Sequence, residues 1–275
     1  MKFPIVKLCE KVGMRPQNFY KKRKARHRQE IDADLIVQLV REERAFQPRL
    51  GGRKMYYLLN PKLEEVGVRI GRDRFFEVLK GKGLLVEPLP RSPHTTNSHH
   101  NLPVFPNLVK DMLLSAANQA WAADITYIRT DEGFLYLSLI TDLFSRKIVG
   151  FHASDSLETD GCLKALKQAR RNLPADAFPV HHSDRGCQYC SRVYTGKLQG
   201  AKLRISMTEK NHCAENALAE RVNGILKQEY SLGCCFRTMK QAMLAVKQAV
   251  WIYNTRRPHS SLGNKTPEEI HQKVA

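Results

Sequence analysis

The sequence predicts an α/β protein with a mixed five-stranded sheet and flanking helices, preceded by a small all-α region. Three observations support this prediction. Residues 1–86 carry only helical periodicity, a proline-rich stretch follows, and strand-like apolar runs then alternate with amphipathic helical stretches. We therefore expect a helical region over residues 1–86, a linker over 87–118 and an α/β domain over 119–275.

The first 28 residues have the pattern of two helices around a turn. Apolar residues of the first helix recur at helical spacing, namely Ile5, Leu8, Cys9 and Val12. Gly13 interrupts the pattern, and Pro16 suits the first turn of a second helix. Two short helices around a glycine turn resemble a helix-turn-helix DNA-binding motif.

A strongly basic run, Lys21–Arg28, follows this helix pair. Such a run can be a solvated helix end or a stripe of side chains that contacts phosphates. Because it extends a helix-turn-helix-like pair, we expect phosphate contacts. The residues we expect to bind DNA here are Lys21, Lys22, Arg23 and Lys24.

Residues 31–85 are predicted to be helical again. One helix has an apolar stripe made by Leu35, Ile36, Leu39 and Val40. A basic turn around Gly51 precedes the next apolar run, and another helix follows Gly71 with arginines at its start. The region is either a second small DNA-binding module or an all-α connector, and the pattern leaves both open.

From Glu87 to about Asn107 the composition changes to prolines among Ser, Thr and Asn, with little periodicity. This composition is typical of an extended linker. Its histidines, His94, His99 and His100, could bind a metal ion, although polar linker residues are the commoner case.

Beyond the linker, the elements alternate in type. Strands are predicted over 121–128, 133–142, 147–153, 179–184 and 203–207, and helices over 157–172, after 184, over 216–230 and over 239–253. Short connections between the first three strands indicate an antiparallel meander. Three strands, a helix, a fourth strand and further helices is the order of the ribonuclease-H-like fold.

The charge balance limits the classes of molecule that the protein is expected to bind. The chain has 45 Lys and Arg against 27 Asp and Glu, which gives a net charge of +18 and a pI near 9.7. A surplus of this size attracts nucleic acid, an anionic membrane surface or an acidic protein. No apolar stretch approaches the ~20 residues that cross a bilayer, and the N-terminus does not look like a signal peptide. We therefore expect a cytoplasmic protein that binds nucleic acid.

The seven cysteines are expected to be reduced thiols, because they are odd in number and scattered. Cys187 and Cys190 have the spacing of half a zinc site. A structural zinc site normally has a second close pair, which the sequence lacks, so we do not expect zinc.

Three acids fall where metal-dependent phosphate chemistry would need them. Asp124 lies in the first predicted strand, Asp184 at the end of the fourth, and Glu220 in a later helix. Among 27 acids a trio at some spacing is easy to find, so the spacing alone is weak evidence. Phosphodiester cleavage needs an activated nucleophile and neutralisation of charge, and two hard cations bound by carboxylates supply both.

Local motifs around these acids are more specific. They are Trp121-x-x-Asp124-Ile125-Thr126-Tyr127, His182-Ser183-Asp184-Arg185-Gly186-x-Gln188-Tyr189, Asn216-Ala217-x-Ala219-Glu220, Leu226-Lys227-x-Glu229 and Tyr253-Asn254-x-x-Arg257-Pro258-His259-x-Ser261-Leu262-Gly263. In this order they closely resemble the catalytic protein of the insertion-sequence-three group of bacterial transposases, which belongs to the DDE integrase superfamily. The resemblance is strong over about 121–270 and looser over the N-terminal helices.

The resemblance implies an enzyme that cuts and joins DNA strands in transposition. Asp124, Asp184 and Glu220 would be the catalytic and metal-binding residues, holding two Mg²⁺ or Mn²⁺ ions, with Asp124 between both. Many members have Asp where this chain has Glu215, which is a rival acid, but the motif places the family glutamate at position 220.

The resemblance also implies partners. They are the terminal repeats of the element, target DNA, further copies of the chain, and an upstream-frame helix-turn-helix protein or a fusion to it. The sequence does not specify the repeats, the target preference, the oligomeric state or the need for the upstream protein.

Further residues are candidates for DNA contact. Lys227 lies on the face of Glu220 and can hold a phosphate or be a solvated lysine. Arg256 and Arg257 are expected to touch DNA or to cap the final helix. His182 and His259 can assist proton transfer, but a structural role is the commoner one for such histidines.

Three rival functions remain. A ribonuclease-H-like nuclease that only hydrolyses would share the fold and the acids. A non-catalytic DNA-binding regulator would explain the charge but not three acids in register with the motifs. A glycosidase with paired carboxylates would gain nothing from a surface of +18.

Overall fold

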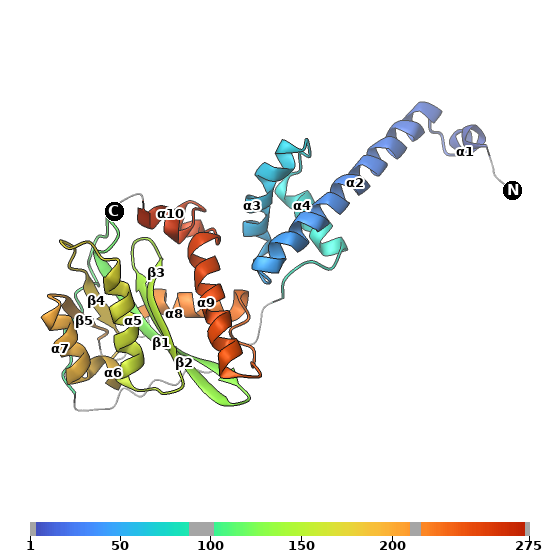
Figure 1. Cartoon of the computed structure of the whole chain (residues 1–275). Coiled ribbons are helices and arrows are strands. Elements are labelled where there is room, and N and C mark those ends of the chain that lie inside the picture. The colour runs from blue at the N-terminus through green and yellow to red at the C-terminus, as the bar shows by residue number, and fades with distance from the viewer. Residues whose placement is uncertain (1–3, 88–101, 210–215, 273–275) are drawn as a thin grey trace. The chain divides into compact units, whose positions relative to one another are not determined.

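Figure 1 shows the computed structural model, which describes residues 4–87, 102–209 and 216–272. Contacts divide the chain into two compact units. One comprises Met1–Phe46 and Leu50–Val86, and the other comprises Gln47–Arg49 and Glu87–Ala275. The linker histidines His94, His99 and His100 lie outside the described residues.

The first unit is helical, as expected. It consists of α1 (Ile5–Lys11), α2 (Pro16–Phe46), α3 (Gly52–Glu65) and α4 (Arg72–Gly81). Gly13 has φ +64°, a left-handed conformation that glycine adopts easily, and it separates α1 from α2. Apolar side chains from α2, α3, α4 and the loops between them form its core, namely Ile36, Val40, Leu50, Met55, Leu59, Leu63, Val68, Phe75 and Leu79.

The long helix α2 differs from the expectation of two helices. It runs without interruption for 31 residues, because no glycine or proline stands between Pro16 and Phe46. Its first half is exposed throughout residues 20–31 and carries the basic run Lys21–Arg28, whereas its second half packs into the core of the unit. No helix within the described part of the chain, α2 included, is both long and apolar enough to cross a membrane.

The second unit contains the predicted mixed sheet. Its strands are β1 (Ala120–Thr130), β2 (Gly133–Asp142), β3 (Ile148–Ser154), β4 (Val180–Ser183) and β5 (Arg204–Met207), in the order β3-β2-β1-β4-β5. The first three pair antiparallel, whereas β4 runs parallel to β1 and β5 parallel to β4. This topology confirms the predicted ribonuclease-H-like fold.

Helices cover both faces of this sheet (Figure 1). The helices described in this unit are α5 (Thr159–Arg171), α6 (Cys187–Cys190), α7 (Arg192–Gly200), α8 (Ala217–Glu229), α9 (Met239–Thr255) and α10 (Pro267–Gln272), with a 3₁₀ turn over Ser260–Leu262. Trp121 and Ala123 pack with α5, α6 and α7, whereas Ile128 packs with α8 and α9. Because side chains alternate along a strand, the even-numbered residues around Asp124 face α8 and α9.

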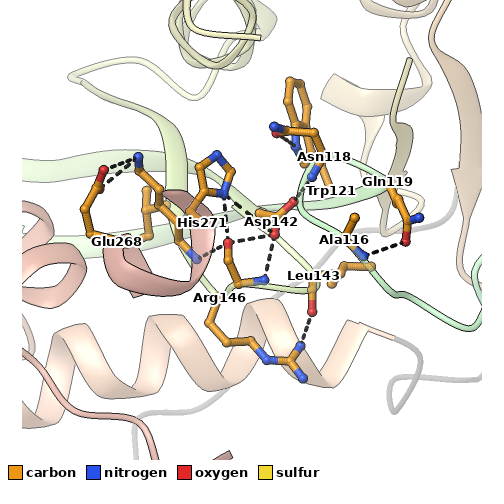
Figure 2. A network of polar contacts seen from close by, with 12 residues as sticks. Ala116, Asn118, Gln119, Trp121, Asp142, Leu143, Arg146, Glu268 and His271 are labelled. Carbon is orange, nitrogen blue, oxygen red and sulfur yellow. Dashed lines mark hydrogen bonds and ion pairs between the residues drawn. The ribbon is translucent and has the colours of Figure 1, made fainter. Parts of the chain in front are cut away.

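The short helix α10 was not predicted, since the last expected helix covered 239–253. A polar network holds it to the turn between β2 and β3 (Figure 2). Ser145 Oγ lies 2.9 Å from His271 Nδ1 and donates to Asp142 Oδ1 at 2.7 Å, while Lys147 pairs with Glu268 at 2.8 Å.

Candidate active site

Asp124 lies in β1 and is held at both carboxylate oxygens. The Ile125 backbone N–H donates to Oδ1 at 2.9 Å, and Asn223 Nδ2 from α8 donates to Oδ2 at 2.7 Å. The side chain is half-buried under α8, in agreement with its place among the even-numbered residues of β1.

Asp184 follows directly after β4, the parallel neighbour of β1. The register pairs Ala123 with Ser183, so Asp124 and Asp184 are the next residues along two adjacent strands. The backbone N–H of Gly186 donates to Asp184 Oδ1 at 3.0 Å. A Cβ added at Gly186 would lie 3.0 Å from the same oxygen, so a larger residue would crowd the carboxylate.

Glu220 lies in the first turn of α8 and is half-buried. The residue before this helix, Asn216, is buried and donates from Nδ2 to the Ala123 carbonyl at 3.4 Å. The rival acid Glu215 lies outside the described residues.

The three acids influence one another electrostatically. Burial, together with the negative charges of Asp184 and Glu220, raises the pKa of Asp124 to about 7, against the lowering effect of its two hydrogen bonds. The structure thus brings the three predicted acids into one neighbourhood. Within the described residues, no three His, Cys, Asp or Glu side chains are grouped closely enough to hold a metal ion.

Asp142, at the end of β2, is a buried acid with a different environment (Figure 2). It is fully buried and accepts hydrogen bonds from the backbone of Asn118 and from the backbone and hydroxyl of Ser145, at 2.7 to 2.8 Å. Because these contacts fix the turn after β2, Asp142 has a structural role.

Lys227 lies near the acids, in the last turn of α8. Burial lowers the pKa of its ammonium, and the negative charge of Asp124 opposes that shift. The half-buried ammonium is therefore within electrostatic reach of Asp124.

Arg257 differs from the expectation of a DNA contact. Its side chain is 2% exposed, and its guanidinium donates two hydrogen bonds of 2.7 Å to the Glu229 carboxylate. A guanidinium buried in this way fixes the end of α8 to the segment after α9 and is not presented to a phosphate. Its neighbour Arg256 is half-buried.

The two candidate histidines are buried and have structural contacts. His182 Nδ1 lies 2.9 Å from Ser206 Oγ on β5. The His259 ring packs edge-on against Tyr253, with 5.0 Å between centroids. In the other unit, Lys21, Lys22, Arg23 and Lys24 are all exposed.

Sequence reasoning missed Asn223 and Gly186 as neighbours of the acids. Asn223 lies three residues after Glu220, close to one helical turn, and that spacing was the only signal in the sequence. Gly186 was part of a motif, but only the folded structure shows that its N–H donates to Asp184.

Comparisons with known proteins agree with this architecture. Two models described as "Integrase core domain" match residues 115–213 and 201–267. The "Insertion element IS600 uncharacterized 31 kDa protein" of Shigella sonnei is 38% identical over 223 residues, which cover 79% of this chain and 82% of that protein. The "Transposase InsF for insertion sequence IS3A" of Escherichia coli strain K12 is 37% identical over 199 residues, covering 71% of this chain and 68% of that transposase. The chain belongs to the IS3-type family of transposases.

The family resemblance predicted from the motifs is thereby confirmed. Among solved structures, the catalytic core domain of HTLV-2 integrase, determined in complex with magnesium, is 22% identical with a TM-score of 0.45. That comparison covers 57% of this chain and 97% of the integrase domain.

Proposed function

We propose that this chain cuts DNA at the ends of an insertion element and joins them to target DNA, in a reaction that depends on divalent cations. Asp124, Asp184 and Glu220 are the catalytic acids of this proposal. The observation that supports it most is the placement of Asp124 on β1, Asp184 directly after the parallel strand β4 and Glu220 on α8, where the charges of Asp184 and Glu220 help to raise the pKa of Asp124.

The donor set fits a hard cation. Two carboxylates 4 Å apart repel each other by about 4 kcal/mol at an effective dielectric of 20. The charges of Asp184 and Glu220 raise the pKa of Asp124, and a bound cation would relieve this repulsion. Carboxylate oxygens suit Mg²⁺ and Mn²⁺, whereas zinc prefers nitrogen and sulfur ligands. Asp124 would contact both of two ions, and Asp184 and Glu220 would each complete one site.

Two such ions, when bound, activate the attacking water or 3′-hydroxyl and neutralise the leaving oxygen. The chain's own residues orient the reactants. Asn223, Ile125 and Gly186 hold the carboxylates, and Lys227, whose ammonium is influenced by Asp124, would bind a phosphate of the DNA end. On the other unit, the exposed residues Lys21, Lys22, Arg23 and Lys24 would hold DNA more distantly.

The partners in this proposal are DNA and protein. DNA is bound as element terminal repeats and as target, in the bacterial cytoplasm on the nucleoid. Holding two ends together requires at least two copies of the chain, and the upstream-frame helix-turn-helix protein or a fusion to it is a further partner.

The acid assignment is tested with Asp184→Asn. We expect loss of strand cutting and joining on end-containing DNA with Mg²⁺, DNA affinity within about twofold of wild type, and unchanged or slightly raised thermal stability without metal, because a repulsive charge is removed. Asp176→Asn, an exposed acid of the same unit, is the matched control and should retain activity. Wild-type joining by Asp184→Asn would contradict the assignment.

The products separate this proposal from its rivals. A transposase yields joined or circular DNA, whereas a nuclease that only hydrolyses yields cut ends alone. If the chain binds end DNA but forms neither product, with or without the upstream protein, the regulator is the better description.

A further inference from the structure

We propose that Asn223 is a positioning residue, which fixes the Asp124 carboxylate in the orientation that binds the divalent cation. The inference rests on the proposed function, since it concerns how one of the three acids is presented. It assigns to this chain a metal-site residue that carries no charge and is not a ligand.

The geometry restricts rotation of the Asp124 carboxylate. Asn223 Nδ2 donates to one oxygen at 2.7 Å and the Ile125 N–H donates to the other at 2.9 Å. An ionised carboxylate offers about four lone-pair directions, so two donors on different oxygens fix the plane of the group and leave directions on both oxygens for a cation.

An amide suits this place better than a charged donor. A lysine or arginine at position 223 would neutralise Asp124 and compete with a cation, whereas an aspartate would add a fourth negative charge. An asparagine donates a hydrogen bond and leaves the charge of the site unchanged.

Asn223 also connects α8 to β1 beside Glu220. Asn216, Glu220 and Asn223 follow one another at intervals of about one helical turn on the same side of α8. Asn216 donates to the Ala123 carbonyl at 3.4 Å, and Asn223 donates to the next residue, Asp124. Two amides thus join the helix to the strand on either side of Glu220, and they set its position relative to Asp124.

The arrangement has an energetic cost. The Oδ1 atoms of Asn216 and Asn223 are buried and have no hydrogen-bond partner among the described residues. A buried polar atom without a partner is unfavourable, and a well-packed apolar residue would avoid this cost. The contact that offsets this cost at Asn223 is therefore the hydrogen bond from its Nδ2 to the Asp124 carboxylate.

The test measures Mn²⁺ binding to the full chain by calorimetry, together with strand transfer as a function of Mn²⁺ concentration. Asn223→Ala should weaken Mn²⁺ binding about 10- to 100-fold, the usual effect of removing a group that orients a metal ligand. High Mn²⁺ should restore strand transfer to Asn223→Ala but not to Asp184→Asn. Asn223→Gln retains the amide but places it one methylene farther from the backbone. This variant should remain folded and should also bind Mn²⁺ more weakly. It replaces Asn223→Ala in the test if the alanine variant does not fold.

Asn254→Ala is the matched control. Asn254 bonds both the N–H and the carbonyl of Ile148 with its side-chain amide, on the edge strand β3. Loss of these two hydrogen bonds should lower thermal stability. It should not change Mn²⁺ affinity or the Mn²⁺ concentration that gives half-maximal strand transfer. If Asn223 had only a structural role, its variants would also lose stability and keep their Mn²⁺ affinity. Unchanged Mn²⁺ affinity in a folded Asn223 variant would therefore overturn the inference.

Asp124→Asn distinguishes failure of the positioning role of Asn223 from failure of the proposed function. If Asp124→Asn abolishes Mn²⁺ binding and strand transfer while the Asn223 variants bind as wild type, only the positioning role is wrong. Strand transfer by Asp124→Asn, or a wild-type chain that binds no Mn²⁺, would remove both proposals.

Discussion

Arg257 and Glu229 form a buried bidentate ion pair, with two nitrogen–oxygen distances of 2.7 Å. The pair joins the last residue of α8 to the segment that follows α9. The Arg257 guanidinium carbon also lies 6.0 Å from the centre of the Tyr253 ring. Since α8 carries Glu220 at its other end, this pair stabilises the helix that presents the third acid.

Breaking the pair from one side should destabilise the second unit. Arg257→Met removes the guanidinium that donates to the Glu229 carboxylate, and loss of one member of a buried pair costs about 3–5 kcal/mol. Urea unfolding followed by tryptophan fluorescence measures this, because both tryptophans, Trp121 and Trp251, belong to that unit. The double variant Arg257→Met/Glu229→Leu should recover much of the loss. A stable Arg257→Met with a shallower salt dependence of DNA binding would instead indicate a phosphate contact.

Gly186→Ala should reduce strand transfer with little loss of stability. The backbone at this position tolerates alanine, since φ is −61°, but the added Cβ would lie 3.0 Å from Asp184 Oδ1 and displace the carboxylate. We expect a loss of about tenfold or more in strand-transfer rate, because small misplacements of catalytic groups are costly. Gly196→Ala, in α7 with open space around it, is the control and should stabilise the chain by roughly 0.5–1 kcal/mol. Equal rates in both variants would contradict the role given to Gly186.

The basic run should contribute to DNA affinity through counterion release. Each phosphate contact makes the slope of log affinity against log salt concentration more negative by about 0.9. Replacing Lys21, Lys22, Arg23 and Lys24 with glutamine should therefore make the slope less negative by up to about 4. Filter binding between low and moderate salt measures the slope. Lys197→Gln, an exposed lysine of α7, should leave the slope unchanged. An unchanged slope in the quadruple variant would show that these four cations remain in solvent.

His181 should make the second unit sensitive to acid. Burial, assisted by the neighbouring His182, lowers the pKa of His181 to about 3, and its Nε2 lies 2.9 Å from the Tyr194 hydroxyl. The folded state thus keeps the ring neutral, so stability from this residue is fully present above the unfolded pKa near 6.5 and is lost as pH falls toward 3. Between pH 7 and pH 5 we expect a loss of about 2 kcal/mol. Urea midpoints of His181→Gln should fall less than those of wild type over this interval, and an equal fall would exclude His181 as the source.

The sequence predicted the order of elements well, because strands and helices differ in the period of their apolar residues. It did not predict the continuity of α2, since the change from basic to apolar composition near Ile31 was interpreted as a boundary although no helix breaker stands there. The short helix α10 was also missed, because six residues contain too little of a helical repeat to be recognised.

For the candidate site, the sequence predicted which side chains would carry chemistry but not how each is surrounded. Arg257 and Lys227 are both basic residues in motifs. Arg257 forms a buried ion pair with a carboxylate, whereas Lys227 lies half-buried near Asp124. Such differences depend on contacts between residues far apart in the chain. The amide of Asn223 and the carboxylate of Asp124 are the clearest example, since only packing of α8 on β1 brings them together.

The acids are distributed over β1, the end of β4 and α8, and this distribution has a consequence for incomplete chains. A product that stops before α8 would retain the helical unit with its basic helix but would lack Glu220. On the proposed function, such a fragment would still hold DNA through its basic helix without cutting it. Premature termination or internal deletion would therefore produce an antagonist of the intact protein, and an element that accumulates such copies would restrain its own spread.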